Sequence, residues 1–311
     1  MNRDTAYERI EALHANIRQV FVGHGRVVDH LLVGLLAGGH VLIQDVPGVG
    51  KTTLARALAK SIDCDFKRVQ FTPDLLPSDV IGVSIYDQEK REFRFIPGPI
   101  FANVVLADEI NRTPPRTQSA LLECMSEGQV SVDGETRVLQ VPFMVLATMN
   151  PVEYHGTYEL PESQMDRFLL RLEIGYPDAE GERRIFRDQR NAHPLDELSA
   201  TVSGADVVAF QSLTRETKVD PSLEEYVIAL VAATREHPEI LLGASPRATL
   251  ALFRAAQARA LLDRRDYVIP DDIKEMAIPV LAHRLGSRAA TGVESTGGVL
   301  RELLAQTPVP A

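Results

Sequence analysis

The stretch that decides the fold is Val41-Leu42-Ile43-Gln44-Asp45-Val46-Pro47-Gly48-Val49-Gly50-Lys51-Thr52-Thr53. It begins with a short apolar run bounded by turn residues, a pattern typical of a buried strand. A turn rich in glycine follows, and the residues from Leu54 to Ile62 then form a helical pattern. A strand that passes through a glycine-rich turn into a helix indicates an α/β architecture.

The glycine-rich turn has the composition of a phosphate-binding loop, or P-loop. In such a loop, the backbone N–H groups of the turn and of the following helix N-terminus point at phosphate oxygens. Lys51 would neutralise the β and γ phosphates, and the Thr52 hydroxyl would ligate Mg²⁺. Asp45 stands where the strict pattern has glycine, which leaves the conformation of the first turn open. The alternative interpretation is a glycine-rich turn beside an exposed lysine.

Polar residues follow two further apolar runs. Val104–Ala107 leads into Asp108 and Glu109, and Phe143–Thr148 is followed closely by Asn150. Ligand sites of open parallel sheets lie at the carboxyl ends of the strands. We therefore expect Asp108 to hold the metal, Glu109 to activate water as a general base, and Asn150 to orient that water. The alternatives are that the two acids cap the next helix and that the asparagine belongs to an ordinary turn.

The order of the predicted elements indicates a parallel sheet covered by helices. Two hairpin patterns, Val83–Phe95 and Gln129–Val141, interrupt the alternation of strands and helices, and after residue 178 only helical patterns remain. We expect an α/β core at residues 1–190, with N-terminal helices and the two hairpins, and a helical domain at residues 191–311. The predicted strands of the sheet are Val41–Ile43, Phe66–Phe71, Val104–Ala107, Phe143–Thr148 and Phe168–Ile174.

The composition excludes several classes of protein. The 311 residues are 45% hydrophobic and 24% charged, which excludes a largely disordered chain. The formal net charge is −10, and acidic residues outnumber basic ones in both predicted domains, so nucleic acid is not an expected partner. Cys64 and Cys124 have no ligand spacing, which argues against structural zinc and disulfides. The chain opens without an apolar signal segment, and its most apolar run, Leu31–Gly39, is too short for a membrane span. We expect a cytoplasmic protein.

Together the motifs resemble those of the AAA+ ATPases and, more narrowly, of the MoxR group. The resemblance runs from about Val22 to about Arg284, which is most of the chain. The motifs that carry it, in order, are Gly48–Thr52, Ala107–Arg112, Ala147–Pro151, Leu160–Phe168, Gly243–Arg247 and Val268–Ile273.

The resemblance implies an AAA+ P-loop core with a five-stranded parallel sheet, an all-α lid, and a ring, commonly hexameric, with ATP and Mg²⁺ between subunits. Asn150 would be the first sensor, Arg247 the second, and Arg167 an arginine finger that reaches the γ phosphate of a neighbour. The alternative for both arginines is a structural ion pair. The hairpins would face the pore of the ring. The residues expected to bind the nucleotide are Val22, Gly23, Pro47, Gly48, Val49, Gly50, Lys51, Thr52, Thr53 and Asp108, with Thr52 and Asp108 at the metal.

For the function, the resemblance implies ATP hydrolysis coupled to chaperone-like remodelling or maturation of partner proteins or metalloenzyme complexes, often with a partner that bears a von Willebrand factor A domain. One alternative is a helicase-like or transcription-activator-like ATPase, which would need a nucleic-acid module. The other is a nucleotide-binding scaffold that does not hydrolyse. Glu109, Asn150 and Arg167 argue against a scaffold, because a scaffold has no physical need for a carboxylate that activates water.

Overall fold

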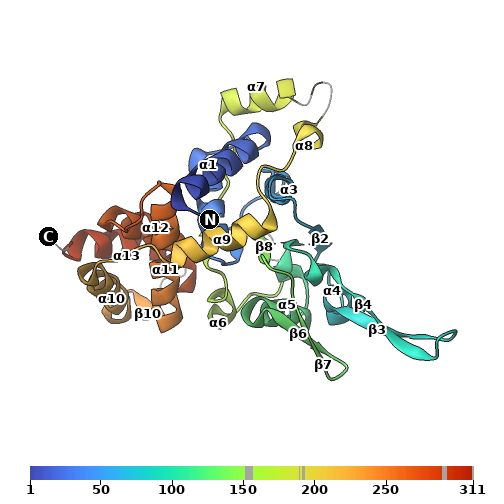
Figure 1. Ribbon diagram of the computed structural model, residues 1–311. Coiled ribbons are helices and arrows are strands. Elements are labelled where there is room, and N and C mark those ends of the chain that lie inside the picture. Colours follow the sequence, from blue (N-terminus) through green and yellow to red (C-terminus); the bar gives the residue numbers. More distant parts are fainter. Residues whose placement is uncertain (151–156, 189, 191–192, 289–292, 310–311) are drawn as a thin grey trace.

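A parallel sheet of five strands forms the centre of the computed structural model, which describes residues 1–150, 157–188, 190, 193–288 and 293–309 (Figure 1). The strands lie in the order β2-β5-β8-β1-β9, and every neighbouring pair is parallel. The five-stranded parallel sheet predicted from the sequence is confirmed. Its strands are β1 (Val41–Gln44), β2 (Phe66–Gln70), β5 (Val104–Asp108), β8 (Met144–Met149) and β9 (Leu170–Leu172).

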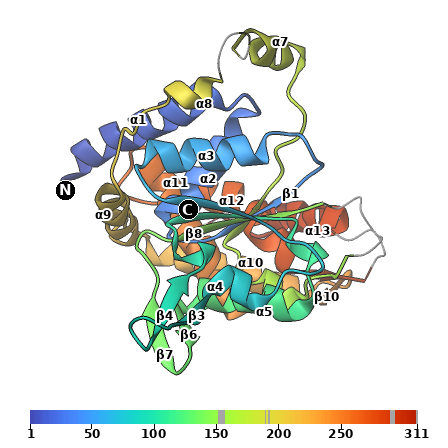
Figure 2. The same ribbon diagram turned by 90° about the vertical axis from the view of Figure 1, so that its right-hand side faces the viewer.

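Alternate residues of each central strand enter different hydrophobic clusters, because successive side chains of a strand point to opposite faces of the sheet. In β1, Val41 and Ile43 join one cluster and Leu42 joins the other. Both faces of the sheet are therefore buried, and Figure 2 shows α1 and α3 over one face and α4 and α5 over the other. The bounds of these helices are Arg3–Val20 for α1, Lys51–Ser61 for α3, Pro77–Ile81 for α4 and Pro115–Glu127 for α5.

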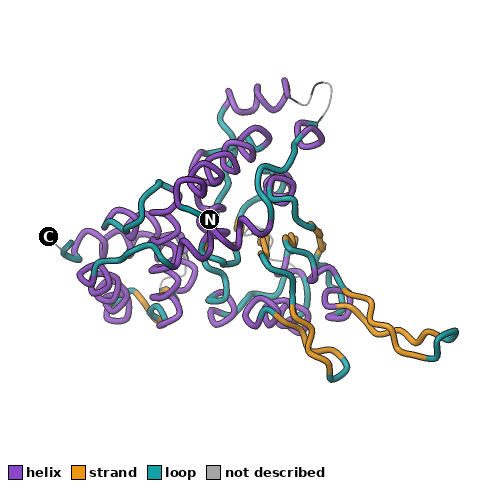
Figure 3. The backbone as a smooth tube through the Cα atoms, viewed as in Figure 1, coloured by secondary structure: helices purple, strands orange, loops and turns teal. Residues whose placement is uncertain are grey.

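Two β-hairpins leave the same side of the core (Figure 3). The first pairs β3 (Gly82–Asp87) with β4 (Glu92–Pro97), and the second pairs β6 (Gln129–Val132) with β7 (Glu135–Val138). Both hairpins were expected from the alternating sequence pattern. Asp133 and Gly134 have the positive φ angles that a tight two-residue turn requires.

The C-terminal part of the described chain is mainly helical and forms the lid. Its helices share one continuous hydrophobic cluster with α1, with α2 (Gly25–Leu36) and with one face of the sheet. Helix α12 packs against β9, while α11 packs against α2. Four elements of this part were not expected from the sequence pattern: the short α8, the last helix α13, and the two-stranded pair of β10 and β11. The remaining elements are α6 (Glu162–Met165), α7 (Ala179–Asp188), α8 (Pro194–Glu197), α9 (Gly204–Arg215), α10 (Pro221–Glu236), β10 (Ile240–Leu242), α11 (Pro246–Leu262), α12 (Pro270–Leu281), β11 (Gly286–Ser287), α13 (Val293–Gln306) and the 3₁₀ turns η1 (Pro99–Phe101), η2 (Ile110–Arg112) and η3 (Ala282–Arg284).

No helix among the described residues is both long and apolar enough to cross a lipid bilayer.

Candidate active site

The P-loop connects the carboxyl end of β1 to the N-terminus of α3. Gly48 and Gly50 have φ angles of 88° and 93°, which glycine adopts without the steric cost that a side chain brings. A Cβ on Gly48 would meet no heavy atom within 4 Å, so the space in front of the loop is open. Lys51 is the first residue of α3 and Thr52 is the second. The free N–H groups of this helix end therefore face the open space, where an anion is favoured.

Asp45, which departs from the strict P-loop pattern, anchors the loop. Its backbone does not lie in the left-handed region, so glycine is not needed at this position. One carboxylate oxygen accepts hydrogen bonds from the N–H groups of Ile174 and Gly175, at 2.6 and 2.7 Å, and the other accepts from Val46 N–H. The carboxylate thus ties the loop to the chain that leaves β9 and does not disrupt the turn.

Lys51 connects the P-loop with two acids on another strand. Its Nζ donates a hydrogen bond to the carbonyl oxygen of Asp45 at 2.6 Å. Partial burial lowers the pKa of the Lys51 ammonium, and the charges of Asp45, Asp108 and Glu109 act in the opposite direction. The ammonium therefore lies within electrostatic reach of both predicted catalytic carboxylates.

Asp108 and Glu109 are held in position by Thr148, which is fully buried on the neighbouring strand β8. The Thr148 hydroxyl donates to Asp108 Oδ1 at 2.6 Å and accepts from Glu109 N–H at 2.8 Å. Glu109 has a φ of 58°, an uncommon value for a residue with a side chain. This bend turns the Glu109 carboxylate away from the path of β5, and one hydroxyl fixes both acids relative to each other.

Two residues of β2 complete this cluster. Gln70 Nε2 donates to Glu109 Oε2 at 2.7 Å, and the Arg68 guanidinium pairs with Asp108 Oδ2 at 2.6 Å. The sequence analysis assigned neither residue, nor Thr148. Their signal was available, because Gln70 and Thr148 lie near the carboxyl ends of predicted strands, where ligand sites of parallel sheets form. The partnership itself required the strand order, which places β2 beside β5.

Asn150 follows β8 directly and is buried, with 6% of its surface exposed. Strand β8 lies between β5, which carries the acids, and β1, which leads into the P-loop. Asn150 is therefore placed between the carboxylates and the phosphate-binding turn. The following residue of the predicted motif, Pro151, lies outside the described residues.

A cavity of about 390 Å³ adjoins the P-loop. Val22 lines it, and Gly23 packs against the ring of Phe21, which also lines it. His24, the next residue along the chain, lines a separate cavity beside Arg26 and Arg171. The residues that line the P-loop cavity are Val20, Phe21, Val22, Gly48, Val49, Gly50, Thr53, Tyr176, Pro177, Glu182, Ile185 and Phe186.

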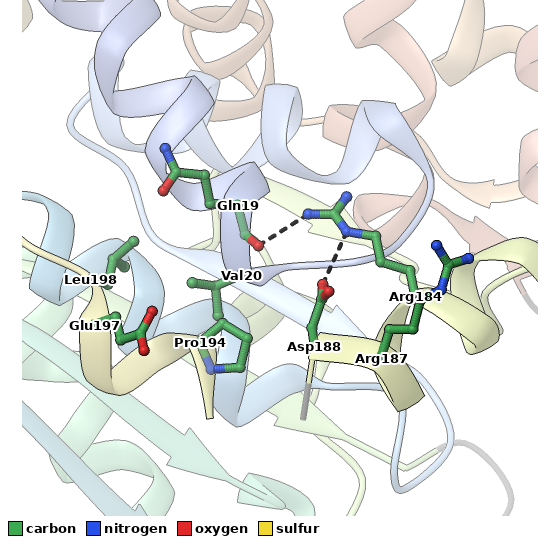
Figure 4. Close-up of a pocket in the computed structure, with 8 residues that line it drawn as sticks. All are labelled: Gln19, Val20, Arg184, Arg187, Asp188, Pro194, Glu197 and Leu198. Carbon is green, nitrogen blue, oxygen red and sulfur yellow. Dashed lines mark hydrogen bonds and ion pairs between the residues drawn. The ribbon is translucent and has the colours of Figure 1, made fainter. Parts of the chain in front are cut away.

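Helix α7 forms the outer wall of this cavity, and the sequence analysis did not assign it a role there. The helix has no buried residue, and Phe186 is 77% exposed. Arg184 attaches α7 to α1 by donating to the carbonyl oxygens of Arg18 and Gln19, each at 3.0 Å. Figure 4, a close-up of a second pocket on another side of α7, shows the bond to Gln19 and the ion pair of Arg184 with Asp188. An arginine that bonds the last carbonyls of a helix also complements the dipole of that helix.

The residues present fit a Mg²⁺–nucleotide. Mg²⁺ prefers oxygen ligands and is usually held by one or two side chains together with water and substrate phosphates. Thr52 is partly exposed at the start of α3 and next to Lys51, whose ammonium lies within electrostatic reach of Asp108, so a hydroxyl and a carboxylate flank the phosphate-binding turn. Pro47 is exposed at the tip of the loop, and Thr53 borders the adjoining cavity.

Arg167 lies at the opposite edge of the sheet, meaning the side where the parallel strands begin, whereas the P-loop follows the carboxyl end of β1. It precedes β9, and the N–H of nearby Leu169 bonds the carbonyl of His40, which precedes β1. The length of β1 therefore separates Arg167 from the P-loop by about 13 Å along the strand direction. The Arg167 guanidinium donates to Leu122 O at 2.6 Å and to Ser126 Oγ at 3.0 Å. Within the described part of the chain it pairs with no carboxylate, which removes the ion-pair alternative there.

Arg247 lies at the same edge as Arg167. It is exposed in the first turn of α11, two residues after Ser245, whose hydroxyl donates to Asp166 Oδ2 at 3.0 Å. Its positive charge acts on Arg284, another partner of Asp166. The described residues include no ion-pair partner of Arg247. The structure thus brings both predicted γ-phosphate arginines together, and it keeps both away from the P-loop of their own chain.

Comparisons with known proteins identify the family of the chain. Residues 40–170 match the ATPase family associated with various cellular activities (AAA), and residues 232–303 match the AAA lid domain. The chain is 52% identical to YeaC of Bacillus subtilis (strain 168), an uncharacterized protein, over 95% of this chain and 93% of YeaC. It is 44% identical to chaperone MoxR1 of Mycobacterium tuberculosis, over 86% of this chain and 73% of that protein.

A solved structure from Cytophaga hutchinsonii, named provisionally as an ATPase, superposes with a TM-score of 0.92 at 42% identity, covering 99% of this chain and 97% of that chain. The family resemblance found in the sequence is confirmed by these relatives and by the fold. The chain belongs to the MoxR group of AAA+ ATPases.

Proposed function

We propose that this protein binds ATP with Mg²⁺ at the P-loop and hydrolyses it to ADP and phosphate. The observation that carries the proposal is the convergence of Lys51, Asp108 and Glu109 at the edge of the sheet where the strands end. A scaffold that only binds nucleotide would need the P-loop but not the second carboxylate. The family membership supports the same conclusion.

In the proposed reaction each residue has one task. The N–H groups of the P-loop and Lys51 hold the phosphates, and Glu109 accepts the proton of the attacking water. Asn150 holds that water in line with the γ phosphate. Thr52 and Asp108 would hold Mg²⁺, which supplies positive charge to the β and γ phosphates. The adenine would occupy the cavity between Val22 and α7.

We propose further that the active site is completed by a second subunit. Arg167 and Arg247 lie at the edge of the sheet opposite to the P-loop, so they cannot reach a nucleotide bound to their own chain. A head-to-tail arrangement brings one edge of a subunit against the other edge of its neighbour, and such an arrangement closes into a ring. A hexamer is the proposed closed form.

The proposed work of the ring is the remodelling of partner proteins in the cytoplasm, together with a von Willebrand factor A domain protein. The chaperone name of MoxR1 supports this reading. Both projecting hairpins also carry exposed apolar side chains. Phe93 of the first hairpin is 74% exposed and Val138 of the second is 73% exposed. Apolar side chains on projecting strands suit contact with protein.

The test of hydrolysis compares two variants that fail at different steps. Lys51→Ala removes a phosphate counter-charge and is expected to lose nucleotide binding. Glu109→Gln keeps the shape and the bond to Gln70 but removes the base, so ATP is expected to bind and persist. The two are measured by fluorescent-nucleotide binding and phosphate release. Hydrolysis by Glu109→Gln at the wild-type rate would contradict the assignment of the base.

The test of the partner class measures hydrolysis with added DNA or with a von Willebrand factor A domain protein. We expect single- and double-stranded DNA to leave the rate unchanged and the protein partner to alter it. Shortening the Val83–Phe95 hairpin to a two-residue turn should abolish the response to the partner and keep basal hydrolysis. Strong stimulation by DNA, without a partner effect, would favour a helicase-like ATPase.

A further inference from the structure

An arginine at the base of the lid is buried against the segment that carries Arg167. Arg284 ends the 3₁₀ turn after α12, and only 4% of its surface is exposed. Its Nε donates to Asp166 Oδ1 at 2.8 Å, and Nη1 donates to Leu169 O at 2.9 Å. Its Nη2 donates to Phe168 O. One lid side chain therefore bonds three of the four residues from Asp166 to Leu169.

These bonds hold the segment on both sides of Arg167. The neighbouring lid residue, His283, also bonds Phe168 O, at 3.2 Å, through Nε2. On the other side, the N–H of Leu169 bonds the carbonyl of His40 at the edge of the sheet. The backbone around Arg167 is thus fixed between sheet and lid, while the Arg167 side chain turns the other way, toward α5.

Asp166 connects Arg284 with the helix that carries Arg247. Its Oδ1 accepts from Arg284, and its Oδ2 accepts from the hydroxyl of Ser245, the N-cap of α11. Arg247 follows Ser245 by two residues. One carboxylate therefore joins the backbone beside Arg167 to the first turn of the helix that presents Arg247.

The chemistry of Arg284 suits this position. Burial lowers the pKa of its guanidinium to about 10, although the hydrogen bond with Asp166 acts in the opposite direction. The group is therefore still charged at neutral pH. A planar guanidinium directs several N–H groups at fixed angles, whereas a lysine ammonium is a single point charge on a flexible chain. An arginine can bond Asp166, Phe168 and Leu169 at the same time.

We propose that Arg284 is a positioning residue that fixes Arg167 and Arg247 as one unit, so that the core and the lid present both arginines together to the nucleotide of the neighbouring subunit. The inference rests on the proposed function. Since Arg284 touches neither the P-loop nor the cavity beside it, its removal should impair the site of the neighbour and spare the site of its own chain.

The first test is steady-state hydrolysis by Arg284→Met. We expect kcat to fall about 10²-fold, the loss that a small misplacement of a reacting group produces, while KM and nucleotide binding stay within about twofold of wild type. Arg265→Met is the matched control, because Arg265 pairs with buried Asp272 inside the lid and does not contact the Asp166–Leu169 segment. It should lower the melting temperature but keep kcat.

The second test mixes subunits and separates positioning from general damage. Mixed with Glu109→Gln, Arg284→Met should regain activity, because it supplies an intact base and its neighbour supplies a correctly held Arg167. Mixed with Arg167→Ala, it should regain none, because both subunits lack a working finger. Asp166→Asn, at a partly exposed position, is the second variant if Arg284→Met fails to fold, and it should follow the same pattern with a smaller loss of kcat.

The outcomes distinguish this inference from the proposed function. If Arg167→Ala retains full activity, or if wild-type protein does not hydrolyse ATP, the proposed function fails. If Arg167→Ala is inactive but Arg284→Met and Asp166→Asn keep kcat, or raise KM alone, the inference is wrong. Recovery in the mixture with Arg167→Ala would also overturn it, because the two defects would then lie in different parts of the site.

Discussion

The separation of Arg167 from the P-loop predicts how activity depends on the mixture of two inactive variants. Arg167→Ala removes the finger and keeps the base, whereas Glu109→Gln removes the base and keeps the finger. Arg167→Ala should lose about 10³-fold or more in hydrolysis, the range known for arginine fingers. Glu109→Gln should lose about 10²- to 10⁴-fold, the range known for general bases. A competent site forms only where an intact Glu109 meets an intact Arg167 of the next subunit.

The size of the recovery follows from this geometry. With random assembly, the fraction of competent interfaces is the product of the two subunit fractions, whatever the number of subunits in the ring. An equal mixture should therefore recover about a quarter of the wild-type rate when each subunit uses one face toward each neighbour. The curve of rate against composition should be symmetric and should peak at the equal mixture.

The assay is steady-state phosphate release after subunit exchange, with mixed oligomers verified by two affinity tags. The control is a mixture of Lys51→Ala with Glu109→Gln. Both defects lie at the same edge of the same chain, so no arrangement of subunits restores a site and no recovery is expected. Verified mixed rings that recover nothing in the first mixture, or that recover activity in the control, would refute the division of the site between two chains.

Three further predictions concern groups that hold the site and the sheet. Thr148→Val removes the hydroxyl that bonds Asp108 and Glu109. We expect kcat to fall about tenfold in steady-state kinetics and the unfolding free energy to fall by about 1–3 kcal/mol in urea titrations. Thr148→Ser should largely restore both quantities. Gln70→Ala removes the hydrogen bond that holds the Glu109 carboxylate, so the rate of phosphate release in the absence of a protein partner should rise. An unchanged rate would show that Gln70 does not restrain Glu109. Burial lowers the pKa of His40 from 6.5 to about 4, so the neutral imidazole stabilises the fold fully above pH 6.5 and this contribution is lost as the pH falls toward 4. Urea titrations should show a loss of about 3 kcal/mol in unfolding free energy over that range. His40→Gln should make the unfolding free energy much less dependent on pH.

The parts of the fold that depend on local pattern were predictable from the sequence. Three strands of the sheet, β1, β5 and β8, are short and largely apolar runs, and Gly48 and Gly50 mark the turn that leads from β1 into α3. Asp133-Gly134 likewise specifies a tight hairpin turn. In each case the signal lies within a few residues, so no knowledge of distant contacts was needed.

The parts that depend on strand order and on packing were not predictable. Gln70 meets Glu109 only because β2 lies next to β5, and nothing near Gln70 in the sequence indicates this. Asp45 departs from the P-loop sequence pattern, and its role as an anchor becomes clear only from its hydrogen bonds to Ile174 and Gly175. The last helix, α13, was missed, because its stabilisation comes from packing against α10 and α12 more than from its own sequence.

The same distinction explains why the role of Arg247 required a structure. The family resemblance implies that Arg167 serves the nucleotide of a neighbour, but it does not say whose nucleotide Arg247 serves. Under the proposed function, Asp166 gives a physical reason to assign both arginines to a neighbour, because it bonds Ser245 near Arg247 and Arg284 near Arg167, at the edge of the sheet opposite to the P-loop. A subunit built in this way has a binding edge and an activating edge. In the proposed ring, hydrolysis would then respond to the position of a neighbour, and a machine that does work on a partner protein requires such a response.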